Sequence, residues 1–426
     1  MRDAPSTLPV DPWIAGRFVL EDVAGSGGMG TVYRAFDTLT QKRVALKLLR
    51  STRSDPLDVE RFTREARILS QLDHPAIVAY VAHGFAEAGH PFLAMEWLEG
   101  EDLSQRLRRE GVSLRGALAL LRRAATALDV AHGLGVVHRD LKPSNLFLRD
   151  GQPELVKLLD FGVAHHTDHA SITLTRTGAV VGTLEYMAPE QVRGQRDVGP
   201  GADIFSLGCV FFECLTGRSP FTAEHATAAL AKVLFEDPPR LRDLRPELPE
   251  ALETLLTRML HKDPELRLRD AATLLAALEP LSIAVELPAV ASSLETAATG
   301  LVDDEQRLVN VIIATTDEPI DEQTTLSPQA EHGQPQPDAL RELTAPYNAR
   351  VELLADGSFV AMLSQDHGEA TDRAVQAARC ALLIKERWPA TTVVLTTGRC
   401  LTHERAPIGE AISRISSESS VSSLFD

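Results

Sequence analysis

Residues 17–37 read RFVLEDVAGSGGMGTVYRAFD, in which a glycine loop stands between two runs of aliphatic, β-branched and aromatic residues. Gly25, Gly27 and Gly30 give the spacing G-x-G-x-x-G, which occurs in several phosphate-binding folds and in plain flexible turns. Both flanking runs have strand character, so the stretch predicts an antiparallel hairpin. A dinucleotide-binding fold is disfavoured, because its glycines lead from a strand into a helix.

Length, charge and cysteine use exclude several classes of protein. The chain has 426 residues, enough for two or three domains, and its four cysteines lack both metal-ligand and disulfide spacing. We expect buried thiols in a reducing compartment. A net charge of −17 argues against a nucleic-acid partner, which needs a basic face. The sequence shows no secretory signal and no membrane-spanning run, so we expect a cytoplasmic protein. The apolar run 204–215, IFSLGCVFFECL, predicts a buried core helix.

Composition divides the chain into three zones. Residues 14–281 are expected to form one domain, with strands first and long amphipathic helices after them. Small residues dominate 282–304, which predicts a linker. Residues 305–426 are expected to form a second, smaller domain. Its segment at about 318–338 is polar, Pro-rich and without periodicity, which predicts a flexible insertion.

A third predicted strand, KRVALKLL at 42–49, places Lys47 inside an apolar run. A buried lysine is costly unless an anion pairs with it. A helix is predicted to begin at Asp55-Pro56, and Glu65 lies on its inward flank with Phe62 and Leu69. We therefore expect Glu65 to pair with Lys47. The alternative is two unrelated charged side chains that reach water separately.

Further motifs follow in a fixed order: HRDLKPSNLFL at 138–148, LLDFGVA at 158–164, APE at 188–190, DIFSLG at 203–208 and KDPELR at 262–267. With the glycine loop, VALK and Glu65, this series resembles the bacterial eukaryotic-type (Hanks-type) serine/threonine protein kinase domain over about residues 17–281. The resemblance implies an α+β bilobal kinase fold, with a β-rich N-lobe and a helical C-lobe. It also implies transfer of the ATP γ-phosphate to Ser or Thr hydroxyls of protein substrates.

The resemblance assigns roles around ATP and Mg²⁺, where catalysis is mostly positioning and charge neutralisation. Lys47, held by Glu65, is expected to bind the α and β phosphates. Asp160 and Asn145 are expected to bind Mg²⁺ through oxygen. The residues expected around ATP are Gly25, Ser26, Gly27, Gly28, Met29, Gly30, Val32, Ala45, Lys47, Met95, Glu96, Leu98 and Phe147.

Three residues indicate the acceptor by the same resemblance. Asp140 is expected to accept or orient the proton of the attacking hydroxyl. Lys142 resembles the lysine that contacts the γ-phosphate in serine/threonine kinases, and Thr183 the threonine of the substrate loop that contacts the catalytic loop. The acceptor is therefore expected to be Ser or Thr. Glu190 and Arg267 resemble a buried structural ion pair.

The loop between DFG and APE contains TLTRTGAVVGT, similar to a double-threonine site that bacterial relatives phosphorylate on themselves. We predict Thr175 and Thr177 as autophosphorylation sites, because a phosphate dianion there could pair with Arg139. Dimerisation would serve that reaction. The alternative is that these are ordinary loop threonines.

The last third predicts the order β-α-β-β-α-β, which resembles a class III nucleotidyl cyclase homology domain, a ferredoxin-like α+β fold. Asp356 matches a metal-binding hairpin aspartate of such cyclases, but Thr315 or Thr316 stands at the other metal position. Ser413 stands where an asparagine is expected. We therefore expect a degenerate, partner-binding domain, with cyclase activity as the less favoured alternative.

A pseudokinase that binds ATP or partners without catalysis is the alternative for the larger domain. The sequence speaks against it, because it retains the expected catalytic set: Lys47, Glu65, Asp140, Asn145 and Asp160.

Overall fold

The computed structural model of the chain describes residues 12–27, 30–49, 56–87, 89–161, 184–195, 197–223, 226–286, 306–316, 337–354, 358–363, 370–389 and 391–401. Among these residues, no helix combines the length and the apolar character that crossing a membrane requires. The chain forms two compact units. The first comprises Met1–Asp168, Gly199–Gly217 and Leu268–Ser282, and the second His169–Val198, Arg218–Arg267 and Ile283–Asp426.

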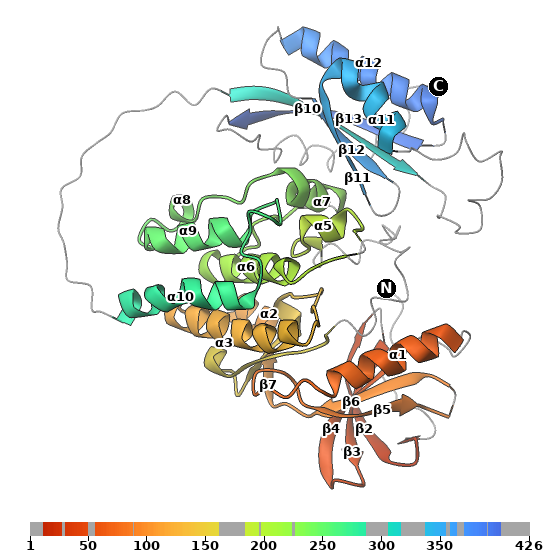
Figure 1. The fold of residues 1–426 in the computed structure, drawn as a ribbon, viewed down its shortest axis with the longest axis vertical. Coiled ribbons are helices and arrows are strands. Elements are labelled where there is room, and N and C mark those ends of the chain that lie inside the picture. The colour runs from red at the N-terminus through yellow and green to blue at the C-terminus, as the bar shows by residue number, and fades with distance from the viewer. Residues whose placement is uncertain are drawn as a thin grey trace. The chain divides into compact units, whose positions relative to one another are not determined.

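The first unit opens with a six-stranded antiparallel sheet of order β1-β2-β3-β4-β6-β5 (Figure 1). Its strands are β1 Trp13–Ile14, β2 Phe18–Gly27, β3 Gly30–Asp37, β4 Lys42–Leu49, β5 Tyr80–Phe85 and β6 Pro91–Glu96. The hairpin predicted around the glycine loop is confirmed as β2 and β3, and the third predicted strand as β4. From Tyr33 to Asp37 every second residue is buried, because successive side chains of a strand point to opposite faces.

Apolar side chains on one face of this sheet form its core, among them Phe18, Leu20, Tyr33, Val44, Leu46 and Phe92. Helix α1 (Pro56–Leu69) confirms the helix predicted from Asp55-Pro56. It lies against β5 (Figure 1). Phe62 of the helix and Phe85 of the strand meet edge to face, with ring centroids 5.7 Å apart.

The rest of the first unit is mainly helical. Its helices are α2 Leu103–Arg109, α3 Leu114–Gly133, α6 Gly201–Thr216 and α10 Ala271–Glu286, and a small sheet contains β7 Gly100–Asp102, β8 Leu146–Arg149 and β9 Val156–Leu158. Helix α6 is buried along nearly its whole length and packs on α3, which confirms the core helix predicted at 204–215. It ends at Gly217, whose φ of 81° lies in the left-handed region that glycine adopts without strain.

The second unit begins with short helices: α5 Pro189–Val192, α7 Ala226–Phe235, α8 Leu241–Leu244 and α9 Glu250–Met259. The predicted ion pair of this region is confirmed. Nη1 and Nη2 of Arg267 donate to the two carboxylate oxygens of Glu190 at 2.7 and 3.0 Å, and both side chains are buried. This bidentate geometry suits a guanidinium better than an ammonium.

The second unit also contains a four-stranded antiparallel sheet of order β11-β12-β10-β13 (Figure 1). Its elements are β10 Gln306–Thr316, α11 Pro337–Thr344, β11 Ala349–Leu353, β12 Phe359–Leu363, α12 Ala370–Arg387 and β13 Thr391–Leu401. Alternate strand residues such as Ile312 and Phe359 form a core with Ala377 and Ile384 of α12. This succession of strands and helices is the one expected from sequence, and the family of this domain remains a prediction.

Three of the cysteines, Cys209, Cys214 and Cys380, are buried free thiols, as expected. Burial raises the pKa of Cys380 to about 11. The side chain of Cys400 lies outside the described residues.

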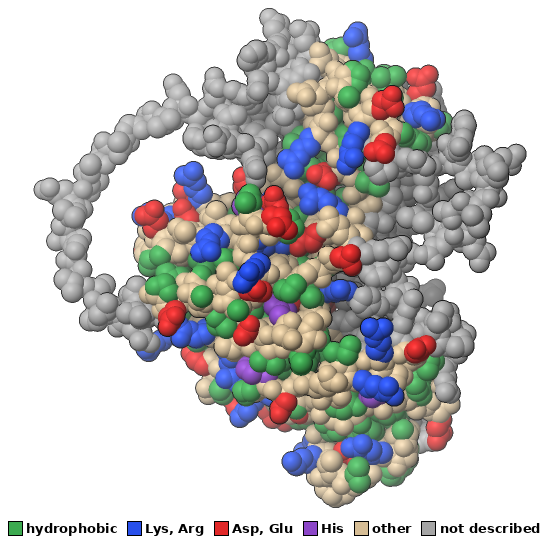
Figure 2. Space-filling model, viewed as in Figure 1, with side chains coloured by type: hydrophobic (Ala, Val, Ile, Leu, Met, Phe, Trp, Pro, Cys, Tyr) green, Lys and Arg blue, Asp and Glu red, His purple; other side chains and the backbone are tan. Residues whose placement is uncertain are grey.

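Charged side chains of both signs are scattered among hydrophobic and other residues on the face shown in Figure 2. Among the coloured residues on that face, Lys and Arg lie interspersed with Asp and Glu rather than in one basic patch.

A buried carboxylate stabilises the turn between β3 and β4. Asp37 accepts hydrogen bonds from Nε and Nη2 of Arg17 at 2.8 and 2.7 Å, from the hydroxyl of Thr40 at 2.8 Å and from the amide of Leu39 at 3.0 Å. The hydrogen bond from Arg17 is the main reason that the pKa of Asp37 lies far below its usual range.

Replacing this carboxylate tests its contribution to stability. A lowered folded-state pKa stabilises the fold above the ordinary carboxyl pKa of about 4, and this stabilisation is lost as the pH falls toward the folded-state pKa. We expect Asp37→Asn to lower the free energy of unfolding by about 2 kcal/mol at pH 7, with a smaller difference from wild type at about pH 3. Urea unfolding at both pH values measures this. Asp22→Asn, an exposed change in the same sheet, is the control. An Asp37→Asn effect that does not vary with pH would contradict the assignment.

Candidate functional site

Two charged side chains from distant segments meet at the centre of the site. Nζ of Lys47 on β4 lies 2.8 Å from Oδ2 of Asp160, which follows β9 by two residues. The side chain of Lys47 is only 12% exposed, and that of Asp160 is 34% exposed. A lysine so far from water requires an anionic partner, and Asp160 provides it.

The sequence led us to expect Glu65 as the partner of Lys47. Glu65 lies in α1, but its side chain is outside the described residues, so that pair remains a prediction. The observed pair joins the residue expected at the phosphates to the residue expected at the metal.

Asp140, Lys142 and Asn145 form one hydrogen-bonded cluster. Nζ of Lys142 lies 3.0 Å from Oδ1 and 2.9 Å from Oδ2 of Asp140. Nδ2 of Asn145 donates to Oδ2 of Asp140 at 3.0 Å and to its main-chain oxygen at 2.7 Å. Since Nδ2 of Asn145 makes both bonds, Oδ1 of the same amide is left as an oxygen ligand.

A fully buried carboxylate on α6 holds the backbone of this cluster. Oδ2 of Asp203 accepts from the amide of His138 at 2.8 Å, and Oδ1 accepts from the amide of Arg139 at 2.8 Å. Nε2 of His132 on α3 lies 2.9 Å from Oδ2. Leaving one such buried group unpaired costs about 1–3 kcal/mol, so Asp203 constrains where Asp140 can lie.

Two residues of the site adopt left-handed backbone conformations. Arg139 has a φ of 66° and Asp160 a φ of 52°. Non-glycine residues in such conformations cost of order 1 kcal/mol and persist only where the surroundings hold them. Asp203 holds the amide of Arg139, and Lys47 holds the carboxylate of Asp160. Both left-handed conformations are therefore held by contacts within the candidate site.

An apolar cavity adjoins Asp160, lined by residues that include Leu69, Leu72, Ile77, Met95 and Phe161. The ring of Phe161 lies against that of His138, with centroids 4.6 Å apart. Met95, expected at the back of an adenine pocket, lies on β6 opposite Ala45 of β4.

The glycine loop joins β2 to β3, and Gly25, Ser26 and Gly27 end the first of these strands. A Cβ built on Gly25 would meet nothing within 4 Å, whereas one on Gly30 would lie 2.2 Å from the main-chain oxygen of Leu48. The close approach of β4 therefore requires glycine at Gly30. At Gly25 the open space leaves room for a ligand.

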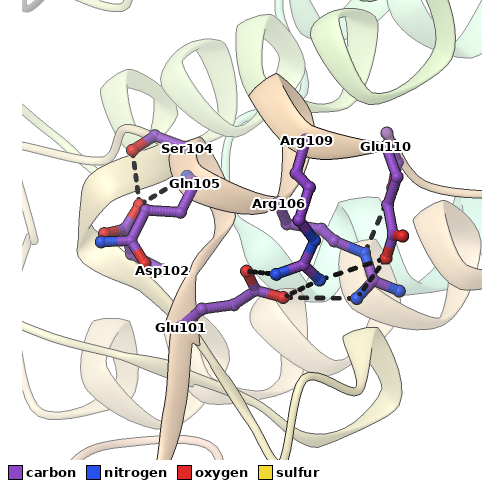
Figure 3. Close-up of polar contacts among 8 residues, drawn as sticks. Glu101, Asp102, Ser104, Gln105, Arg106, Arg109 and Glu110 are labelled. Atoms are coloured by element: carbon purple, nitrogen blue, oxygen red, sulfur yellow. Dashed lines mark hydrogen bonds and ion pairs between the residues drawn. The ribbon is translucent and has the colours of Figure 1, made fainter.

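We call residues 96–98 the hinge, the segment whose backbone is expected to hydrogen-bond the adenine base; it begins at Glu96, the last residue of β6, and ends at Leu98. Past it, Asp102 caps α2 by accepting from the amide of Gln105 at 2.9 Å and from the hydroxyl of Ser104 (Figure 3). Glu101 binds both terminal nitrogens of Arg109 at 2.8 Å (Figure 3). These contacts attach β7, which follows the hinge, to α2.

The other expected adenine neighbours lie on strands of the first unit. Val32 pairs with Lys47 across β3 and β4, and Phe147 of β8 pairs with Lys157 of β9. Gly28, Met29, Thr175, Thr177 and Thr183 lie outside the described residues, so their expected roles remain predictions.

The donor set fits a magnesium ion. The carboxylate of Asp160 and the amide oxygen of Asn145 are hard oxygen ligands, and the amide of Leu159 donates to the main-chain oxygen of Asn145 at 2.9 Å. Within the described part of the chain, no group of three or more His, Cys, Asp or Glu could hold a metal on its own. Magnesium suits such a site because it takes one or two protein ligands and completes its shell with phosphate and water.

Asp203 has a structural role that the sequence analysis did not assign, although it quoted DIFSLG. The available signal was a carboxylate next to the long apolar run of α6. A charged residue in a buried helix requires buried donors, and two of these proved to be main-chain amides.

Comparison with known proteins identifies a matching family and relatives. The protein kinase domain family model matches residues 18–277. The serine/threonine-protein kinase pkn3 of Myxococcus xanthus is 40% identical over 287 residues, which are 66% of this chain and 52% of pkn3. The serine/threonine-protein kinase PknA of Mycobacterium tuberculosis is 40% identical over 263 residues, 60% of this chain and 59% of PknA. The chain thus spans between half and three fifths of the length of these relatives.

Solved structures of a protein kinase domain are also similar to this chain. The crystal structure of the PknI kinase domain of M. tuberculosis superposes with a TM-score of 0.52 at 27% identity and covers 64% of this chain and 99% of that domain. A second crystal structure of the same domain gives a TM-score of 0.50 and covers 66% of this chain.

The two ends of the glycine loop should respond differently to a methyl group. We expect Gly30→Ala to lower the free energy of unfolding by about 2 kcal/mol, because its Cβ overlaps the backbone of β4. Gly25→Ala, the matched control, should change it by less than about 0.5 kcal/mol. Urea unfolding of both variants measures the difference, and equal effects would contradict the strand-packing explanation.

Proposed function

The chain belongs to the protein kinase family through residues 18–277, and we propose that it is an active serine/threonine kinase that uses ATP and Mg²⁺ to phosphorylate proteins. The observation that carries this proposal is the contact between Lys47 and Asp160. The segment that contains Asp160 is hydrogen-bonded to Asn145, and Asn145 is in turn hydrogen-bonded to Asp140. This arrangement offers a suitable group for each of three components: the phosphoryl donor, the metal and the acceptor hydroxyl.

In this proposal each residue performs one electrostatic or positioning task. Lys47 binds the α and β phosphates, and the hinge backbone at Glu96 and Leu98 binds the base. Bound Mg²⁺ would neutralise the charge of the β and γ phosphates, held by Asp160 and Asn145. Asp140, oriented by Asn145, receives or orients the proton of the attacking hydroxyl. The fold already holds Arg139 and Asp160 in their strained conformations, so less free energy is needed to order these groups during the reaction.

The acceptor class follows from the catalytic loop and the relatives. Lys142 contacts Asp140, which supports its proposed contact with the γ-phosphate. The two curated relatives are named as serine/threonine kinases, which supports a Ser or Thr acceptor here. Thr183 is proposed to complete the substrate loop.

The alternative of a non-catalytic scaffold is less well supported. A scaffold that only binds nucleotide has no use for a carboxylate that Lys142 and Asn145 both orient. The cluster buries a charged carboxylate, because the side chain of Asp140 is only 10% exposed. Removing that charge from water costs free energy.

Regulation is proposed to act through Arg139. Phosphorylated Thr175 or Thr177 would add a dianion able to pair with this guanidinium and order the loop next to the substrate site. Transfer between two copies of the chain would make dimerisation part of activation.

The C-terminal domain is proposed to be a degenerate cyclase-like module that binds a partner. Its strand order β11-β12-β10-β13, with two helices contributing to one core, supports a ferredoxin-like fold. Strand β10 ends at Thr315 and Thr316, which are poor metal ligands. Cyclic nucleotide formation from ATP or GTP would contradict this part of the proposal. A cytoplasmic location remains part of the proposal as well.

Kinase activity is tested by phosphate incorporation from radiolabelled ATP into the chain and into casein. We expect Asp140→Asn to reduce the rate by about 100- to 10,000-fold, because the variant cannot accept the hydroxyl proton. Asp150→Asn makes the same chemical change at an exposed turn and should keep the wild-type rate. Equal rates for wild type and Asp140→Asn would refute kinase catalysis by this site.

The same reaction tests the regulatory proposal. After phosphatase treatment and incubation with Mg-ATP, mass spectrometry should find phosphate on Thr175 and Thr177 of wild type but not of Asp140→Asn. Thr173→Ala should leave both sites labelled. Phosphate found only elsewhere in the chain would contradict the assignment.

A further inference from the structure

The carboxylate of Glu96 joins three segments of the first unit. Oε1 accepts from the amide of Ala79 at 2.7 Å and contacts Nζ of Lys157. The amide of Glu96 in turn donates to the main-chain oxygen of Ala79 at 2.9 Å. Nζ of Lys157, in the middle of β9, also donates to the main-chain oxygen of Ile77 at 3.3 Å. The ammonium of Lys157 on β9 therefore contacts both the start of the hinge and the segment 77–79.

Residues 76–79 are also attached to β9 by their backbone. Ile77 forms a parallel bridge with Leu158. The amide of Val78 donates to the main-chain oxygen of Leu158 at 3.0 Å, and the amide of Leu158 donates to that of Ala76 at 2.8 Å. Among the contacts described here, Lys157 provides the only side chain of β9 that reaches the carboxylate of Glu96 in the hinge.

Burial makes Lys157 dependent on this contact. The side chain of Lys157 is 9% exposed and that of Glu96 is 31% exposed. An ammonium so far from water needs its anion, whereas a carboxylate exposed to this extent can be hydrated if the ammonium is removed. Replacing Lys157 with an apolar residue therefore removes one of the contacts that hold the carboxylate of Glu96, while its hydrogen bonds with Ala79 remain, and leaves no buried charge unpaired.

We propose that Lys157 is a positioning residue for nucleotide binding, which acts through Glu96 to hold the hinge backbone where it receives the base. This rests on the proposed ATP site. A hinge that is already ordered spares the ligand the cost of ordering it, so the loss of Lys157 should weaken ATP binding. The chemical step depends on Asp140 and should not change.

Lys157→Met tests the proposal, since methionine is close to lysine in length and apolar. We expect the Kd and the KM for ATP to rise about 5- to 10-fold, with kcat within about twofold of wild type, the loss expected for one typical intramolecular hydrogen bond. Calorimetric titration with Mg-ATP gives Kd, and casein phosphorylation gives KM and kcat. In a Glu96→Gln background, Lys157→Met should change Kd less than about twofold, because Lys157 acts through that carboxylate.

Arg123→Met is the matched control. Nε and Nη2 of Arg123 donate to the main-chain oxygens of Val156 and Pro75 at 3.0 Å, so it joins β9 to the same connecting segment, and neither of these two bonds reaches the hinge. We expect Arg123→Met to lower the melting temperature but to leave the Kd for ATP within about twofold. A Kd unchanged in Lys157→Met, or raised equally in both variants, would reduce Lys157 to a packing role. If Lys157→Met does not fold, Glu96→Gln tests the same contact and should itself raise Kd. Failure of wild type to bind ATP would instead refute the proposed function, and the inference with it.

Discussion

The ion pair between Lys47 and Asp160 is the interaction on which the rest of the site depends. It joins the middle of the six-stranded sheet to the segment that follows β9, with residues 48–159 of the chain between the two partners. Each partner is expensive to bury alone, so the fold keeps them together. In the proposed complex, a phosphate chain and a magnesium ion would bind beside a cation and a carboxylate whose positions are already determined. Little reorganisation is then left for the moment of transfer.

The other groups of the site are held by buried polar residues rather than by loop rigidity. Asp203 holds the backbone next to Asp140, and Lys157 holds the carboxylate at the start of the hinge. Buried charges contribute little net stability, but breaking one of these pairs is costly. Their effect is to exclude alternative positions for the catalytic groups. The same logic applies in the second unit to Glu190 and Arg267.

Much of this arrangement could be predicted from the sequence because it depends on local patterns. The hairpin, the strand with Lys47 and the buried helix α6 follow from periodicity and from turn residues. The partner of Lys47 was harder to predict, since a carboxylate on α1 that the sequence pattern predicts to point inward and the aspartate after β9 would both satisfy the same electrostatic need. Lys157 could not be assigned from the pattern, because a lysine in a three-residue strand has no periodicity to mark it as buried. Its role depends on which loop pairs with that strand, a tertiary contact 80 residues away.

The central claim is that Lys47 and Asp160 face one nucleotide and one magnesium ion. The most direct test is the affinity for ATP measured by calorimetry with and without Mg²⁺, in wild type and in Asp160→Asn. The account predicts that Mg²⁺ tightens ATP binding about tenfold or more in wild type and less than about twofold in Asp160→Asn. The same magnesium enhancement in both proteins would contradict it, because the metal would then be bound without Asp160.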